Sequence, residues 1–239
     1  MRGSSLFLIL LLSVVLLATG CRAVTSADFG CSRSFSVVFN RGGPNNLLGR
    51  EVFYFSSSGF VQHYVEDGKC YGYIDSLSQG KLAFDYSRVE ERLRTLVEKD
   101  KKTSDSSSKK ERVEVDFVNP TTCVYFLNRG RVVKEACVSG INGEIYRYLS
   151  RLTRSAPRVK ASKGSLWLEF VPIDTGPAHI SLTKDEFRRN SLLWKAFNCP
   201  FRLVEVSGEL NLPGFWCEAP CSQVLRVEDS YYVLNLEKI

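Results

Sequence analysis

Eight cysteines carry the most evident chemistry of this chain. They are Cys21, Cys31, Cys70, Cys123, Cys137, Cys199, Cys217 and Cys221. An even number of cysteines in an oxidising compartment indicates up to four disulfides, and the count alone leaves their pairing open. Cys217 and Cys221 are separated by three residues rather than by the two of thioredoxin-type motifs. We therefore expect both to be structural, with Cys199 as a partner in the same group.

Two histidines, His63 and His179, limit the catalytic sites that the chain can build. A zinc site of three histidines is impossible, and no His-Glu-x-x-His motif occurs. No Gly-x-Ser-x-Gly motif marks a nucleophile, and no phosphate-binding or dinucleotide-binding loop is present. His63 alternates with Val61 and Val65, which favours a structural place on a strand. We predict no catalytic residues, no metal and no cofactor.

A pair of carboxylates is the one hydrolytic arrangement that the sequence leaves open. Glycosidases use two such groups, and the chain has 26 acidic residues from which a pair could form. No spacing singles out two of them. A carboxylate-dependent hydrolase is therefore the third of the functions that we consider.

Six cations follow one another without an intervening acidic residue. They are Arg147, Arg151, Arg154, Arg158, Lys160 and Lys163. Clustered cations attract anions, so Arg147, Arg151 and Arg154 are candidate contacts for anionic lipid, acidic polysaccharide or an acidic protein. The other interpretation is a solvent-exposed helix face followed by a linker. We expect no nucleic-acid partner, because the aromatic residues occur at strand periods rather than among these cations.

The N-terminus has the pattern of a secretory signal peptide over residues 1–20. A positive residue, Arg2, precedes an apolar run at residues 6–18, which is too short to span a bilayer. The residues before Cys21 resemble the lipobox of bacterial-type lipoproteins, although Ala18 stands where leucine is usual. Lipidation would tether the protein to a membrane through Cys21, whereas ordinary cleavage would leave Cys21 free to pair. Either way we expect an extracytoplasmic protein, with residues 21–33 as an N-terminal tether.

Alternating apolar and polar residues predict six strands in the first part of the mature chain. They cover residues 34–39, 52–55, 60–65, 113–117, 123–127 and 131–138. The sequence Asn128-Arg129-Gly130 separates the last two strands and predicts a hairpin. This hairpin sets Cys123 nearly opposite Cys137, within the reach of a disulfide, so we predict that the two are bonded.

Two helices are predicted among these strands. The first begins with a capping box formed by Ser87 and Glu90. The second covers residues 143–154 and has an apolar stripe, Ile145, Leu149 and Leu152, opposite the three arginines. Residues 98–111, between the first helix and the next strand, contain no apolar residue and are predicted to be a mobile loop.

A smaller region follows a polar stretch that contains Pro157. Strands are predicted at residues 166–171, 180–182, 201–206, 224–227 and 231–236. Thr183 and Glu186 form a capping box that opens a helix through residue 197. We expect an α+β fold with antiparallel sheets, each packed against one or two helices and stabilised by disulfides. The expected domains are residues 34–157 and 158–239.

The glycine-rich opening of the first domain resembles that of emfourin-like domains. The resemblance rests on Phe39-x-Arg41-Gly42-Gly43 and on Ser58-Gly59-Phe60-Val61, and it covers residues 34–154 at most. Some members of that family inhibit thermolysin-type metallopeptidases, so the resemblance implies a peptidase as partner. This chain departs from the pattern through Pro44-Asn45-Asn46, its cysteines and its charged insert. A loop at residues 41–49, held by a rigid sheet, would make Arg41, Asn45 and Asn46 binding residues.

The sequence thus leads to an exported, non-catalytic protein that binds another protein, and the resemblance implies inhibition of a peptidase. The alternative is an envelope or cell-surface protein that contacts anionic lipid or polysaccharide through the basic helix face.

Overall fold

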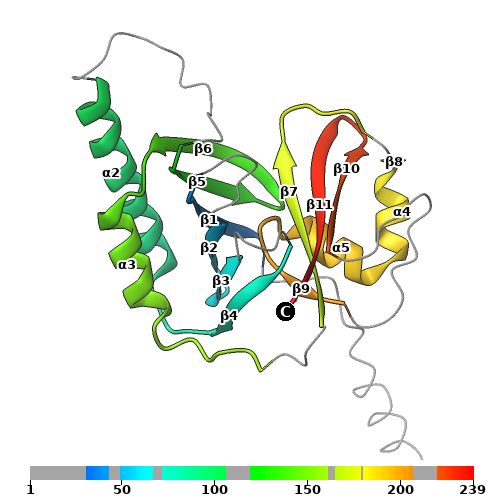
Figure 1. Cartoon of the computed structure of the whole chain (residues 1–239), viewed down its shortest axis with the longest axis horizontal. Helices are drawn as coiled ribbons and strands as arrows, with labels where there is room; N and C mark the ends of the chain where they lie inside the picture. The colour runs from blue at the N-terminus through cyan, green and yellow to red at the C-terminus, as the bar shows by residue number, and fades with distance from the viewer. Residues whose placement is uncertain are drawn as a thin grey trace, which may run out of the picture. The chain divides into compact units, whose positions relative to one another are not determined.

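The computed structural model describes residues 31–42, 49–66, 72–105, 119–160, 165–178, 180–206 and 220–239. Residues Cys31–Ile239 form one compact unit. The predicted boundary near Pro157 separates two sheets of this unit (Figure 1).

The first sheet has six strands in the order β4-β3-β2-β1-β5-β6, and every neighbouring pair is antiparallel. Its strands are β1 (Arg33–Asn40), β2 (Arg50–Ser56), β3 (Phe60–Glu66), β4 (Ile74–Lys81), β5 (Thr121–Asn128) and β6 (Arg131–Ser139). β4 was not predicted, because its sequence is mostly polar and lacks an alternating apolar pattern. The strand predicted at residues 113–117 lies outside the described residues.

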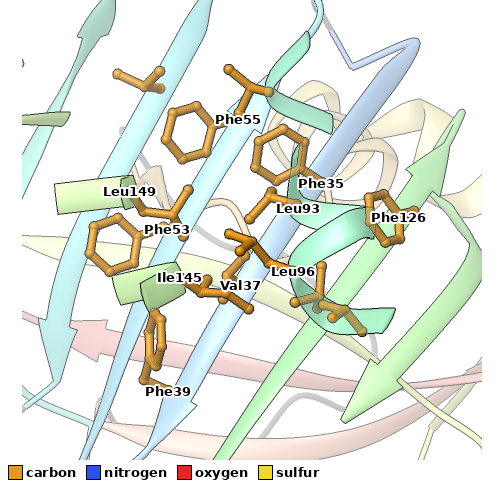
Figure 2. Close-up of a cluster of buried hydrophobic side chains, with 14 of the residues drawn as sticks. Phe35, Val37, Phe39, Phe53, Phe55, Leu93, Leu96, Phe126, Ile145 and Leu149 are labelled. Carbon is orange, nitrogen blue, oxygen red and sulfur yellow. The ribbon is translucent and has the colours of Figure 1, made fainter. Parts of the chain in front are cut away.

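Helices α2 (Tyr86–Asp105) and α3 (Gly143–Thr153) cover one face of this sheet. Figure 2 shows Leu93 and Leu96 of α2, with Ile145 and Leu149 of α3, over the sheet's row of phenylalanines. The apolar stripe predicted for α3 is confirmed at Ile145 and Leu149, which are fully buried. These side chains fix the direction in which the opposite face of α3 points.

The second sheet has the order β8-β10-β11-β7-β9. Its strands are β7 (Leu166–Ile173), β8 (Ile180–Leu182), β9 (Val204–Glu205), β10 (Cys221–Val227) and β11 (Ser230–Lys238). β8 runs parallel to β10, so this sheet is mixed rather than antiparallel throughout as predicted. Helices α4 (Lys184–Arg189) and α5 (Ser191–Asn198) accompany it, and α5 packs on it through Leu193 and Ala196.

The two sheets share a buried cluster, which explains why the central strands are covered on both faces. Val38 and Val52 of the first sheet pack with Trp167, Phe201 and Leu203 of the second region. Alternation in β1 predicted one buried face, but six of its eight residues are buried. The second region therefore covers the face of the first sheet that the helices leave open.

Three predicted helix features need correction. The carboxylate of Asp85 accepts the backbone N–H of Arg88, so Asp85 caps α2, while Glu90 of the predicted capping box pairs with arginines instead. α2 continues to Asp105, so the first part of the loop predicted at residues 98–111 is helical. Lysine, which occurs three times in residues 98–105, is a good helix former, and extending a formed helix costs little. The single helix predicted from Thr183 is divided at Asn190, whose side chain caps α5.

Two disulfides are formed between described cysteines. Cys123 and Cys137 are bonded, as the hairpin predicted, and stand opposite each other with Cα atoms 4.1 Å apart. The Cys137 sulfur also lies beside the carboxylate of Glu135, but a bonded pair offers no thiolates to a metal.

The second disulfide joins Cys31 to Cys199 across 168 residues of sequence, with Cα atoms 5.6 Å apart. Cys199 was expected in a group with Cys217 and Cys221, and that prediction is wrong, because the end of α5 packs beside the start of β1. Cys221 is also disulfide-bonded. Cys21, Cys70 and Cys217 lie outside the described residues.

Candidate functional site

Three arginines of α3 point away from the core. Arg147 and Arg151 follow each other at one-turn spacing, and Arg154 ends the helix. All three side chains are exposed, because Ile145 and Leu149 occupy the buried side of the same helix. The predicted placement of these arginines on an outer face is confirmed.

These arginines have no acidic partners among the residues that the structure describes. None of the three forms an ion pair with any residue that the structure describes, and neither do the following Arg158 and Lys160. We call this set of five residues, Arg147, Arg151, Arg154, Arg158 and Lys160, the basic face. The one acid of α3, Glu144, instead pairs with Arg92 and Lys99 of α2. The charge of the basic face is therefore not neutralised by contacts within the described part of the chain.

The residues after α3 are held against the sheet rather than forming a free linker. The carbonyl oxygen of Pro157 accepts the backbone N–H of Gln79 at 3.0 Å, and the N–H of Val159 reaches the carbonyl of Leu77 at 2.9 Å. This segment runs along the outer edge of β4. Arg158 and Lys160 consequently extend the basic face along the sheet edge.

α2 adds two cations that the sequence analysis did not single out. Burial raises the pKa of Tyr148 in α3, whereas the positive charges of Arg88 and Arg92 act to lower it. Arg88 is exposed and forms no ion pair with the described residues. Ile141, just before α3, is 45% exposed. The helix layer thus combines cations, a tyrosine and an exposed aliphatic residue.

Arg41, predicted as a binding residue, is held by a buried carboxylate. Its guanidinium lies 3.2 Å from Glu51, which also bonds His63 Nε2 at 2.7 Å and the hydroxyl of Tyr146 at 3.3 Å. Burial acts to raise the pKa of Glu51, but hydrogen bonds and charges from His63 and Arg41 outweigh it, so this pKa lies below the ordinary value. The cluster holds the end of β1 to β2 and α3.

His63 has the structural place that the sequence predicted. Its ring stacks on Phe53 with centroids 4.1 Å apart, and its ring nitrogen contacts Glu51. In the described parts of the chain no serine or cysteine side chain hydrogen-bonds to His63. The described serines and cysteines therefore supply no nucleophile aligned with this carboxylate–imidazole pair.

The loop expected to recognise a partner is described only at its ends. Gly42 and Gly49 have positive φ angles of 80° and 77°, and the backbone N–H of Arg41 donates to the carbonyl of Gly49 at 3.1 Å. Only glycine adopts such angles at little cost, which explains the glycines at these two positions. Asn45 and Asn46 lie outside the described residues.

A buried charge cluster joins the two sheets, and sequence analysis missed it. Arg50 of β2 forms ion pairs with three carboxylates. Its guanidinium lies 2.5 Å from the carboxylate of Glu169 in β7 and 2.8 Å from that of Glu237 in β11, and it also contacts Glu66 of β3. The Tyr64 hydroxyl also donates to Glu169. We call these five residues the seam cluster.

The seam cluster contains more acid than base. With all three carboxyls ionised, one guanidinium would leave a net charge of −2 in a site where Glu169 and Glu237 are almost fully buried. Burial is the main cause that raises the pKa of Glu237 well above its ordinary value, and Glu169 and Glu66 raise it further, against the opposing charge of Arg50. Burial and the neighbouring acids therefore favour the protonated form of Glu237 in the folded protein. Such a cluster is suited to holding sheets together.

No protein-family model, curated protein or solved structure matches the chain. The resemblance to emfourin-like domains thus stays a prediction that rests on residues 39–61. Among the described residues, no helix is both long and apolar enough to span a membrane. The disulfides indicate an oxidising, extracytoplasmic environment.

Proposed function

We propose that this protein is an exported, non-catalytic binding protein that attaches to anionic lipid surfaces through the basic face. The observation that carries the proposal is the set of exposed cations on and after α3 that have no acidic partner among the described residues. Inhibition of a peptidase remains a second hypothesis that rests on sequence resemblance alone.

An anionic surface attracts cations that have no acidic partner within the protein. A cation near an anionic bilayer contributes about 1 kcal/mol, so Arg147, Arg151 and Arg154 together would contribute about 3 kcal/mol. A cation already bonded to a carboxylate would first lose that partner. The attraction falls off within a Debye length of about 8 Å at physiological salt, so the cations must lie at the surface itself.

Lipid is favoured over a soluble polyanion by the residues beside these cations. Tyrosines are enriched where a protein meets the headgroup layer of a membrane. Tyr148 is a half-buried residue of α3, and Ile141 is exposed just before the same helix. The signal peptide predicted at residues 1–20 would also bring the protein across a membrane, and lipid on Cys21 would hold it there.

Sedimentation with vesicles tests the proposal. The chain from residue 22 onward removes any contribution of lipid on Cys21. It should sediment with vesicles that contain phosphatidylglycerol but not with phosphatidylcholine alone, and raising salt should weaken the binding. Changing Arg147, Arg151 and Arg154 together to glutamine should abolish binding and leave the circular dichroism spectrum unchanged.

A matched control removes three charges elsewhere. Lys134, Arg188 and Arg226 are exposed cations that each lie within 4 Å of an acid, and glutamine at all three gives the same net charge as the first variant. This control should still bind vesicles. Equal loss in both variants would mean that overall charge, not the basic face, causes binding, and absence of binding at low salt would refute the proposal.

A further inference from the structure

A groove of about 680 Å³ lies between the β5–β6 turn and the second sheet, and none of the residues that line it belongs to the basic face. We call it the hairpin groove. Its walls come from the turn at Arg129–Arg131, the end of β7, helices α4 and α5, and the β10–β11 turn. Binding sites for small ligands have volumes of about 300–1,000 Å³, so the hairpin groove has room for the last few residues of a peptide.

The turn that forms one wall is fixed in place. Gly130 has a φ angle of 75°, and a Cβ atom there would come within 3.1 Å of the backbone of Asn198 at the end of α5. Only glycine permits this close packing of the turn on the helix. Arg129 and Arg131, on either side of Gly130, are consequently held at the rim of the groove.

The cations of the groove are of two kinds. Lys184 pairs with Glu228, and Arg188 pairs with Asp185. Arg129 and Arg131 form no ion pair with the described residues, although both line the groove. The two arginines on the turn are thus available to an anionic group.

Arg131 and Tyr232 both line the groove. Burial raises the pKa of Tyr232, while its hydrogen bond with Ser230 and the charges of Arg131 and Lys184 act to lower it. Tyr232 is only 6% exposed and packs against Phe197 with ring centroids 5.2 Å apart. An anion bound by Arg131 would therefore lie next to an apolar aromatic wall.

The aromatic wall is better suited to an apolar side chain than to a sugar. Sugars stack on free, flat ring faces. The Arg188 guanidinium instead lies 5.2 Å from the centroid of the Trp194 ring, and the Trp194 and Phe197 rings stack with centroids 5.9 Å apart. The Trp194 ring therefore already has partners within the protein. The wall also contains the aliphatic side chains of Val132, Ile173 and Val227.

We propose that the hairpin groove binds the carboxylate end of a peptide whose last side chain is apolar. Arg129 and Arg131 bind the carboxylate, with charge-assisted hydrogen bonds of the kind that arginine forms with such groups. The last side chain packs against Trp194 and Phe197. Asp174, which also lines the groove and forms no ion pair with the described residues, accepts a backbone N–H of the peptide.

Titration with short peptides tests this site by calorimetry. The probes are N-acetyl-Ala-Phe as the free acid, the same dipeptide as its C-terminal amide, and N-acetyl-Ala-Asp. The free acid with phenylalanine should bind, and both other probes should bind at least tenfold more weakly, because each lacks one of the two features that the groove recognises. Changing Arg129 and Arg131 together to glutamine should weaken binding of the free acid at least tenfold.

The control is Arg147→Gln, which removes a charge of the basic face and should leave peptide binding unchanged. Three results would overturn the proposal: equal binding of acid and amide, no saturable binding at millimolar peptide, or tighter binding of an oligogalacturonate, which would indicate an acidic saccharide instead. Because the site shares no residue with the basic face, vesicle binding can fail while peptide binding persists, and the reverse.

Discussion

Arginine occurs in two opposite settings in this protein. Arg50 is surrounded by three carboxylates between the two sheets, whereas Arg147, Arg151 and Arg154 have no acidic partner among the residues described. A buried charge must be paired, because the free-energy cost of removing it from water would otherwise be too large. An exposed charge needs no partner, since water solvates it. The contrast separates an arginine that maintains the fold from arginines that remain available to a ligand.

The buried setting predicts the largest effect on stability. Changing Arg50 to methionine keeps much of the volume but leaves Glu66, Glu169 and Glu237 without their cation. Breaking a buried pair in this way costs about 3–5 kcal/mol of unfolding free energy. Urea unfolding followed by circular dichroism measures it.

Arg147→Met is the matched change on the surface, and it should alter the unfolding free energy by no more than about 0.5 kcal/mol. Similar losses for Arg50→Met and Arg147→Met would contradict the distinction between the two settings. So would a loss below about 1 kcal/mol for Arg50→Met, because such a value is typical of exposed ion pairs.

The pH dependence of stability tests the buried setting at a second residue, Glu237. Its pKa is raised in the folded state, so the stability that its protonated form contributes is complete below its unfolded pKa of about 4.3 and is lost as pH rises through the folded pKa. Glutamine at this position mimics the protonated form. Glu237→Gln should therefore match the unaltered protein below about pH 4 and exceed its stability at about pH 9 by about 1–3 kcal/mol.

Unfolding free energies measured across this pH range, with Glu144→Gln as the control, test the expectation. Glu144 is an exposed acid of α3, so its variant should follow the pH profile of the unaltered protein. Parallel profiles for Glu237→Gln and the unaltered protein would show that Glu237 does not hold a proton in the seam cluster.

Local sequence patterns predicted what local contacts determine. The hairpin residues Asn128-Arg129-Gly130 indicated the pairing of Cys123 with Cys137, and the spacing of Ile145 and Leu149 indicated which face of α3 carries the arginines. These features depend on neighbours within a few residues. The α+β class followed for the same reason, since strand and helix periods are local.

Local sequence patterns did not predict contacts between residues that are far apart in the chain. Arg50 and Glu237 are 187 residues apart, and Cys31 and Cys199 are 168 residues apart. With 26 acids and eight cysteines, no spacing could select these partners. Only the packing of one sheet on the other brings them together, and a single sequence carries no record of that packing. Arg41 likewise looked like a free loop residue, because its partner Glu51 is identified only by the fold.

The smallest effect on stability is expected from a carboxylate placed within the basic face. It would give exposed arginines an acidic partner, as Arg50 has in the seam cluster. Ser150 lies three residues after Arg147 and four before Arg154, so Ser150→Glu puts an acid within reach of both. Such surface pairs stabilise a helix by only about 0.2–0.5 kcal/mol. Vesicle binding should nevertheless fall severalfold, because two cations gain an internal partner and the face loses one unit of charge.

Ser150→Gln, which has the same shape without the charge, should bind vesicles as the unaltered protein does. If the glutamate and glutamine variants bind equally well, pairing does not decide which arginines are available, and the contrast with Arg50 would explain stability alone.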